Sequence, residues 1–294
     1  MVGGAQIGGL KMAEEYSISE IMVTSLADGI KSGDVIFQGA ATPMPMVAIE
    51  LARATHAKDT VYFSALGVSP RDPLNFEALL TDGLTEVLKK AKLTNYLFGR
   101  EMWDEVNKGK LTLEFLRPAQ IDKYWNCNNC VLYGEDRNFQ KPKFRFPGGM
   151  AVSDAINLME RVILYTPAHR PRTFVDKVDF LMVKGYPLSK WRKENKLGNG
   201  PIKMVTNLCI FEPDPETSLM KIASIHPGVS LNEVLENTGF KPLIPKNIPE
   251  TPKPTNKQLQ LLRETIDPIG FRDLEFPELR MKVMARAAEK GINF

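Results

Sequence analysis

The chain alternates between helical and strand-like hydrophobic patterns over its first 64 residues. Apolar residues at helical spacing predict an α-helix over residues 19–31, and Gly33-Asp34 then turns the chain into the short apolar run 35–37. The small-residue loop 39–45 leads into a second helical pattern, which ends near His56, and a strand is predicted over residues 60–64. This strand, loop, helix, strand order builds parallel sheets with right-handed crossovers. The pattern therefore predicts the α/β class.

The middle of the chain repeats the same alternation. Apolar runs predict strands over residues 111–116, 162–166, 203–211 and 220–225, of which the last two should form a hairpin. Helical spacing predicts helices over residues 81–92, 152–161 and 231–237. We therefore expect an open, mostly parallel sheet with helices on both faces.

The last 54 residues carry a different pattern. The proline-rich residues 241–254 cannot form regular ladders, so we expect an extended strap over the surface. Thr255 and Gln258 form a capping box for a helix that Pro268 ends, and Pro277 begins an amphipathic terminal helix. The expected organisation is a flexible N-terminal arm (1–16), an α/β domain (17–240), and a strap with C-terminal helices (241–294) that pack on the domain or on a partner.

Composition and charge exclude several classes of protein. The apolar content of 43% can fill a packed core, and the net charge of +3 comes from scattered basic and acidic residues, which argues against a nucleic-acid partner. No apolar run approaches the roughly 18 residues that a membrane-spanning helix requires, and the N-terminus lacks a secretory pattern. The three cysteines suggest no disulfide framework. We therefore expect a cytoplasmic protein with no membrane partner.

Cys127 and Cys130 have the two-residue spacing of zinc ribbons and redox dithiols. A structural zinc site needs four ligands, yet the only other cysteine is Cys209 and no histidine lies at a supporting spacing. We therefore predict buried thiols and no metal site. The three histidines form no obvious set: His169 sits in the basic turn Ala168-His-Arg-Pro-Arg, and structural roles are expected for all three. The sequence contains no P-loop, dinucleotide-binding, HExxH or GxSxG motif.

Three small-residue loops follow predicted strands and are candidates for ligand contact. They are residues 39–45, residues 64–69 and the turn Phe146-Pro-Gly-Gly-Met-Ala. In open α/β sheets ligands bind outside the carboxyl ends of strands, where such loops let backbone amides approach phosphate or acyl oxygens. Glycine-rich turns also serve as plain connectors, so the pattern alone leaves both roles open.

Several of these segments resemble one enzyme family. Pro118-Ala-Gln-Ile-Asp-Lys-Tyr-Trp-Asn-Cys-Asn resembles the GAQ-(I/V)-D-x-Y-G-N-x-N segment of glutaconate-type coenzyme A (CoA) transferase beta subunits, and the turn at Phe146 resembles their glycine-rich turn. Glu233-Val-Leu-Glu-Asn-Thr-Gly-Phe and Leu261-Leu-Arg-Glu-Thr-Ile-Asp-Pro resemble the family's C-terminal elements, in the same order. Ile225-His-Pro-Gly-Val is similar to a segment of the related beta subunit that opens steroid rings in bacterial cholesterol degradation. Together they span about residues 19 to 270.

The resemblance implies an α/β beta subunit that forms a heterodimer or heterotetramer with an alpha-type subunit. It implies an active site at the subunit interface that holds an acyl-CoA, with no tightly bound cofactor and with CoA as part of the substrate. In transferases of this family a beta-subunit glutamate attacks the thioester, and backbone N–H groups stabilise the oxyanion.

Two residues depart from the family pattern. The position of the transferase glutamate falls at Ala65, which cannot act as a nucleophile, and residues 60–71 contain no carboxylate. Trp125 stands in place of the usual glycine of the Y-G-N turn, which would put a bulky ring near the expected pocket.

The missing glutamate favours the hydrolase branch, whose essential glutamate comes from the alpha subunit. We therefore expect a subunit of an acyl-CoA hydrolase that cleaves a carbon–carbon bond; the alternatives are a CoA transferase of the glutaconate type and a non-catalytic CoA-binding scaffold. This chain would contribute the walls of the site and oxyanion donors. The candidate residues are Gly39, Thr42, Ser64, Gln120, Asn126, Gly148 and Gly149.

Overall fold

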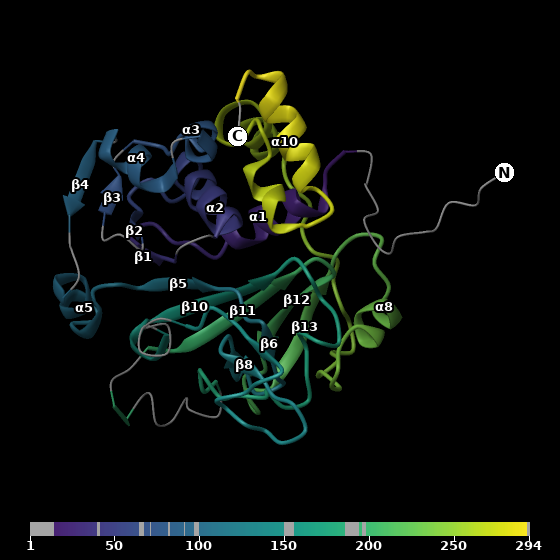
Figure 1. The fold of residues 1–294 in the computed structure, drawn as a ribbon. Helices are drawn as coiled ribbons and strands as arrows, with labels where there is room; N and C mark the ends of the chain where they lie inside the picture. Colours follow the sequence, from purple (N-terminus) through teal and green to yellow (C-terminus); the bar gives the residue numbers. More distant parts are fainter. Residues whose placement is uncertain are drawn as a thin grey trace.

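A computed structural model describes residues 15–39, 42–64, 68–70, 72–81, 83–90, 92–96, 100–149, 156–185, 194–195 and 198–292. Its centre is a seven-stranded sheet in the order β13-β12-β11-β10-β5-β1-β2 (Figure 1). The strands β2, β1, β5, β10 and β11 pair in parallel, and β12 and β13 add an antiparallel hairpin at one edge. The predicted α/β class with a mostly parallel sheet is therefore confirmed. The strands of this sheet are β1 (Val35–Gln38), β2 (Val61–Ser64), β5 (Leu113–Leu116), β10 (Arg161–Thr166), β11 (Gly200–Thr206), β12 (Cys209–Pro213) and β13 (Met220–Ile225).

Helices cover one face of the sheet (Figure 1). A capping box of Ser17 and Glu20 starts α1 (Ile18–Ala27), and α2 (Pro43–Ala54) begins with a proline, whose fixed φ suits a helix start. Both helices bury apolar side chains with those of β5 and β10 in one core cluster. The hairpin of β3 (Val68–Pro70) and β4 (Leu93–Tyr96), with α3 (Phe76–Thr81) and α4 (Gly83–Lys90), continues from β2. The predicted helix over residues 81–92 corresponds to α4, and α3, which precedes it, was not predicted.

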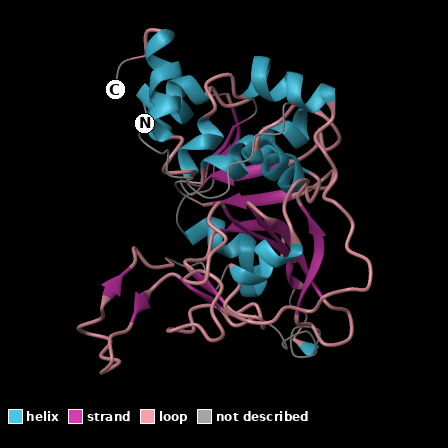
Figure 2. Ribbon diagram, turned by 90° about the vertical axis from the view of Figure 1, so that its right-hand side faces the viewer, coloured by secondary structure: helices cyan, strands magenta, loops and turns pink. Residues whose placement is uncertain are grey.

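The other face is covered mainly by extended chain and short helices (Figure 2). Side chains of α5 (Arg100–Asn107) and α8 (Leu231–Glu236) join its core cluster. Two small hairpins also belong to this region: β6 (Gln120–Ile121) with β7 (Cys127–Asn128), and β8 (Val131–Leu132) with β9 (Phe144–Arg145). Figure 2 shows a two-stranded hairpin that projects from the molecule.

Two sequence predictions are wrong in detail. The run 203–211 was expected to be one strand, but the chain reverses between β11 and β12 because the Thr206 hydroxyl accepts the backbone N–H groups of Leu208 (3.1 Å) and Cys209 (2.9 Å). The hairpin with residues 220–225 therefore involves β12 alone. The helix expected over residues 152–161 cannot reach Arg161, which is the first residue of β10, and only residues 156–158 are helical in its described part.

The C-terminal residues return to the body of the protein. The strap 241–254 runs beside β13, where Leu243 and Glu250 form isolated parallel bridges with Lys221 and Ile225. Thr255 and Gln258 then form the predicted capping box. The elements that follow are α9 (Asn256–Gln260), the π-helical turn η1 (Leu261–Ile266), the 3₁₀ turn η2 (Phe271–Glu275) and α10 (Arg280–Glu289). No helix among the described residues is both long and apolar enough to cross a lipid bilayer.

Candidate functional site

The larger of two notable cavities lies where β5 and β10 end. It has a volume of about 770 Å³. Arg117, Pro118 and Ala119 directly follow β5, and Thr166 is the last residue of β10. The carboxyl ends of parallel strands are where ligands bind in open α/β sheets. The remaining lining residues are Asn129, Leu132, Lys143, Phe144, Phe146, Pro147, Gly148, Ala168, Arg170, Arg172 and Thr173.

Positive charge dominates the wall of this cavity. Its charged lining residues are Arg117, Lys143, Arg170 and Arg172, and no acidic residue of the described chain lines it. Partial burial and the neighbouring charges of Arg172 and Arg117 lower the pKa of Arg170, against an opposing effect of Glu278. Cations that repel one another favour binding of an anion. The cavity is therefore suited to the phosphate or carboxylate groups of a ligand.

Among the four cationic residues that line the cavity, Arg117 alone forms an ion pair with a buried carboxylate of the described chain. Its Nη1 donates to Oε2 of Glu275 at 3.0 Å, and the Arg117 side chain keeps 40% of its surface exposed while Glu275 keeps 2%. The other Glu275 oxygen accepts the Tyr165 hydroxyl and the backbone N–H of Met44, each at 3.0 Å. The C-terminal turn η2 thus reaches the wall of the cavity from behind.

Of the two glycines in the turn after Phe146, Gly148 lines the cavity and Gly149 does not. Gly148 lines the cavity with a φ of 93°, a conformation that favours glycine, and its N–H donates to the Asn129 carbonyl at 3.1 Å. At Gly149 an added Cβ would lie 2.5 Å from Sδ of Met182, so a larger residue here would require the flexible Met182 side chain to move. The Gly148 N–H is therefore engaged with a backbone carbonyl in this structure. The expected role of both glycines as oxyanion donors remains a prediction.

Gln120 is buried, Asn126 is half-buried, and neither lines either cavity. Oε1 of Gln120 accepts from Asn128 Nδ2 (2.7 Å) and from the Asp179 backbone N–H (3.0 Å). Asn126 Nδ2 donates to Asp122 Oδ2 (3.0 Å), and its Oδ1 accepts the Gly185 N–H (3.0 Å). These side chains fix the turn between β6 and β7, and a role toward substrate stays a prediction for both.

The first two loops are described only in part. The Thr42 hydroxyl donates to the Gly39 carbonyl at 3.0 Å, immediately before α2 begins. Ser64 ends β2 and pairs in register with Gln38 of β1. Ala65, which the motif resemblance aligned with the transferase glutamate, lies outside the described residues. The structure therefore brings Gly39 and Ser64 to neighbouring strand ends at one edge of the sheet.

Trp125 does not shape the cavity, and this expectation was wrong. Its ring is fully buried in the core cluster of the second sheet face. Its φ of 64° is the left-handed conformation that glycine adopts at no steric cost, which matches the glycine of the family's turn. Cys127, two residues on, is also buried, and burial raises the pKa of its thiol. The described residues include no group of three or more His, Cys, Asp or Glu side chains placed to hold a metal ion.

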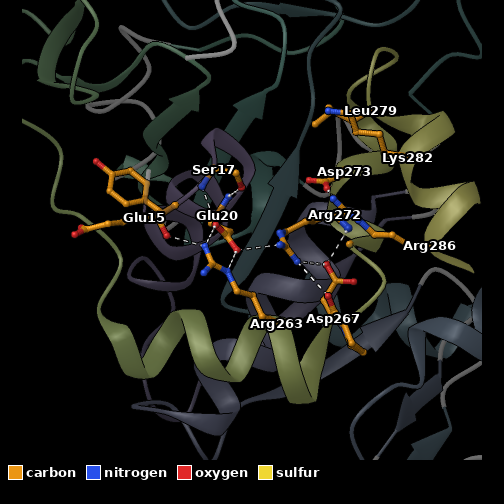
Figure 3. A pocket seen from close by; sticks show the side chains of 13 residues that line it. Glu15, Ser17, Glu20, Arg263, Asp267, Arg272, Asp273, Leu279, Lys282 and Arg286 are labelled. Atoms are coloured by element: carbon orange, nitrogen blue, oxygen red, sulfur yellow. Dashed lines mark hydrogen bonds and ion pairs between the residues drawn. The ribbon is translucent and has the colours of Figure 1, made fainter. Parts of the chain in front are cut away.

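The second cavity, of about 340 Å³, lies between α1 and the C-terminal elements (Figure 3). Glu20 accepts from Arg263 Nε (2.7 Å) and Arg272 Nη2 (3.2 Å), and Arg272 Nη1 donates to Asp267 (2.7 Å). Arg286 pairs with Asp273 at 3.0 Å. These charges compensate one another, so this cluster anchors the C-terminal elements to α1.

Sequence reasoning missed the cations of the larger cavity and Glu275. The basic turn around His169 was visible as Arg170-Pro-Arg172, and Arg117 directly precedes the motif at Pro118. Those two signals could have pointed to the cationic wall. Glu275 has no local signal, because its partners are distant in the sequence.

The chain is similar in sequence to a family of known enzymes. The family model for coenzyme A transferase matches residues 20–237. The chain is 34% identical to the B-type subunit of 3-oxoadipate CoA-transferase from Pseudomonas knackmussii, over 84% of this chain and 92% of that relative. It is 25% identical to the IpdB component of the cholesterol ring-cleaving hydrolase from Rhodococcus jostii, over 89% of this chain and 96% of that relative.

The fold agrees with a solved structure of the same family. Glutaconate coenzyme A-transferase from Acidaminococcus fermentans superposes with a TM-score of 0.69 and 26% identity, over 86% of this chain and 96% of that chain. The resemblance drawn from the motifs is thus confirmed, and so is the fold class it implied. The chain belongs to the coenzyme A transferase family and aligns with its beta-type subunits.

Proposed function

We propose that this chain is the beta-type half of a heteromeric enzyme that acts on acyl-CoA thioesters. One observation carries the proposal: the cavity at the carboxyl ends of β5 and β10 has four cationic side chains and no acidic one among its described lining residues. CoA carries phosphate groups, and such anions bind to guanidinium and ammonium groups. The names of the related chains, which are single subunits, support an alpha-type partner.

The chemistry we propose is hydrolysis of a carbon–carbon bond, with the catalytic carboxylate on the partner. The motif resemblance puts Ala65 at the position at which transferases carry their nucleophile, and residues 60–71 contain no carboxylate that could replace it. A partner carboxylate would take a proton from water, and the resulting hydroxide would add to a ketone carbonyl beta to the thioester. The bond between this ketone carbon and the carbon next to the thioester carbonyl then breaks. The partner carboxyl returns its proton to the carbon next to the thioester carbonyl, and the water oxygen stays in the new carboxylate.

CoA transfer is the second candidate. The 34% identity to one chain of a 3-oxoadipate CoA-transferase favours it. Transfer would form an acyl-CoA from a free acid, whereas carbon–carbon hydrolysis keeps the thioester and takes up water. The two reactions therefore differ in their need for an acceptor acid.

The test uses the chain with and without its alpha-type partner. We expect no turnover by the purified chain alone. We expect the reconstituted complex to convert a cyclic 3-oxoacyl-CoA in ¹⁸O-water, without any acceptor acid, and to place one ¹⁸O in the new carboxylate. A strict requirement for an acceptor acid would support transfer instead, and turnover by the isolated chain would refute the proposal.

The variant Ala65→Glu sharpens the test. A carboxylate at this position restores the group that carries CoA in a transferase. We expect borohydride reduction followed by peptide mapping to find a modified side chain at position 65 only in this variant complex. A CoA adduct on another carboxylate of the unmodified chain would show that transfer is native to this protein.

A further inference from the structure

Glu275 joins three separate parts of the chain behind the larger cavity. Its Oε2 accepts from Arg117 Nη1, which follows β5, and its Oε1 accepts from the Tyr165 hydroxyl of β10 and from the backbone N–H of Met44 in α2. All three distances are 3.0 Å. Both carboxylate oxygens therefore accept hydrogen bonds, and the bond to Oε2 fixes the orientation of the Arg117 guanidinium.

Glu275 is buried, whereas Arg117 is partly exposed at the cavity. Glu275 is 2% exposed and does not line the cavity, whereas Arg117 is 40% exposed and lines it. Burial raises the pKa of Glu275, and the charge of Arg117 and the hydrogen bonds from Met44 and Tyr165 oppose this rise. Arg117 therefore shares with these two hydrogen bonds the stabilisation of a carboxylate whose charge burial disfavours.

We propose that Glu275 is a positioning residue that holds the Arg117 guanidinium at the cavity wall, where Arg117 contacts an anionic group of the acyl-CoA substrate. This inference rests on the proposed function. The anionic group is a phosphate of CoA or a carboxylate of the acyl part, since a guanidinium binds either one. Because Glu275 also accepts the Met44 N–H, the same carboxylate fixes the start of α2, which follows the loop of Gly39 and Thr42.

Glu20 provides a matched comparison. It is 3% exposed, pairs with Arg263 and Arg272, and like Glu275 ties the C-terminal elements to the rest of the fold (Figure 3). Its pairs lie at the second cavity, and no atom of Glu20 lines the larger one. Loss of either carboxylate breaks a buried ion pair, but only loss of Glu275 should change substrate binding.

The experiment measures kcat and KM for acyl-CoA in the complex reconstituted with the alpha-type partner. We expect Glu275→Gln to raise KM about 10-fold, the order expected for a lost charge-assisted hydrogen bond, with kcat within about 2-fold of the wild-type value. We expect Glu20→Gln to lower the unfolding midpoint and leave KM unchanged. The double variant Glu275→Gln/Arg117→Gln should have the KM of Arg117→Gln alone, because the two residues act as a unit.

A second substrate identifies the anionic group. If Arg117 binds a CoA phosphate, the KM effect of Glu275→Gln vanishes with the acyl-pantetheine; if it binds a carboxylate, the effect persists. Should Glu275→Gln not fold, Arg117→Gln carries the test, with the same expected rise in KM.

The outcomes separate this inference from the proposed function. A wild-type complex that neither binds nor converts acyl-CoA defeats the proposed function. An active wild-type complex in which Glu275→Gln and Arg117→Gln leave KM at the Glu20→Gln value overturns the role of Glu275.

Discussion

The guanidinium of Arg161 forms an ion pair with the carboxylate of Asp34 inside the protein, at the edge of the sheet opposite the larger cavity. Arg161 is the first residue of β10 and Asp34 directly precedes β1, so the pair joins the amino ends of strands that flank β5. The Thr112 hydroxyl also donates to Asp34, at 2.9 Å. This polar cluster lies away from the residues proposed to bind substrate.

Asp34→Asn should therefore destabilise the protein without changing substrate binding. Removing one partner of a buried ion pair leaves an uncompensated charge, at a cost of about 3 kcal/mol or more in the free energy of unfolding. Urea unfolding measures this loss. The control is Glu86→Gln, because Glu86 pairs with Lys89 at 2.7 Å on the surface, where such pairs contribute about 0–1 kcal/mol. Equal losses in the two variants would contradict the prediction.

Two buried histidines should make stability depend on pH. His226 Nε2 donates to the Thr206 carbonyl (2.7 Å), and His169 Nδ1 lies 3.0 Å from the Thr206 hydroxyl. Burial lowers the pKa of His226 to about 4, and burial together with the nearby His226 lowers the pKa of His169 to about 3. The unfolded chain then takes up protons below about pH 6.5, while the folded protein does not.

Stability should accordingly be full above about pH 6.5 and should fall as pH decreases toward about 4. Each histidine contributes about 2 kcal/mol to this fall between about pH 6.5 and about pH 5. Urea unfolding over this range measures it. His226→Gln should roughly halve the pH dependence. A wild-type stability that is flat across this range would refute the buried neutral state.

The buried carboxyl group of Glu114 should also make the stability of the protein depend on pH. Glu114 lies in β5 beside Phe37 and Val162, is 1% exposed, and its Oε2 has no hydrogen-bond partner within the described part of the chain. Burial raises the pKa of its carboxyl to about 8. Because the folded pKa lies above the unfolded one, the stabilising contribution is complete below about pH 4.3 and is lost as pH rises toward 8.

Glu114→Gln should hence raise the free energy of unfolding relative to wild type, by about 4 kcal/mol at about pH 8 and by about 1 kcal/mol at about pH 5. Urea unfolding at both pH values gives the comparison. The exposed residue Glu236 supplies the control, and Glu236→Gln should show no such pH-dependent gain. A loss of stability in Glu114→Gln at the higher pH would mean that the ionised carboxylate is paired.

Trp125→Gly tests two opposing effects at one position. Glycine would relieve the strain of a φ of 64°, which costs about 1–2 kcal/mol for other residues, but removal of the buried ring leaves a void that costs about 3–5 kcal/mol. The cost of the void should exceed the relief of strain, so the free energy of unfolding should fall by about 2 kcal/mol. Trp125→Phe, which keeps a ring, should lose less. If the glycine variant were as stable as wild type, the ring would contribute no net packing.

Local sequence signals predicted those elements whose causes are local. The capping box of Thr255 and Gln258 is one, since both partners lie within one turn. The reversal after Thr206 could not be seen, because the apolar residues continue through it and the hydroxyl that makes the turn belongs to a residue common in strands. Hydrophobic pattern thus predicted the strands and not where one of them ends.

The candidate site divides in the same way. The glycine turn at Gly148 was predicted from a motif, and the cavity does lie beside it. Glu275 was not predicted, because its partners Tyr165, Arg117 and Met44 are 110, 158 and 231 positions away in the chain. Only the folded chain shows that a carboxylate near the C-terminus stands behind a cavity formed by the middle of the sequence.

The strap beside β13 has a consequence for any shortened form of the protein. The backbone N–H of Ile222 donates to Leu243 and that of Ile225 donates to Pro249, so the outer side of β13 is occupied by the chain itself. A chain cut after Phe240 would present this strand with open backbone donors and acceptors, ready to pair with a second molecule. The C-terminal residues thus protect the sheet from self-association, and soluble expression should require them.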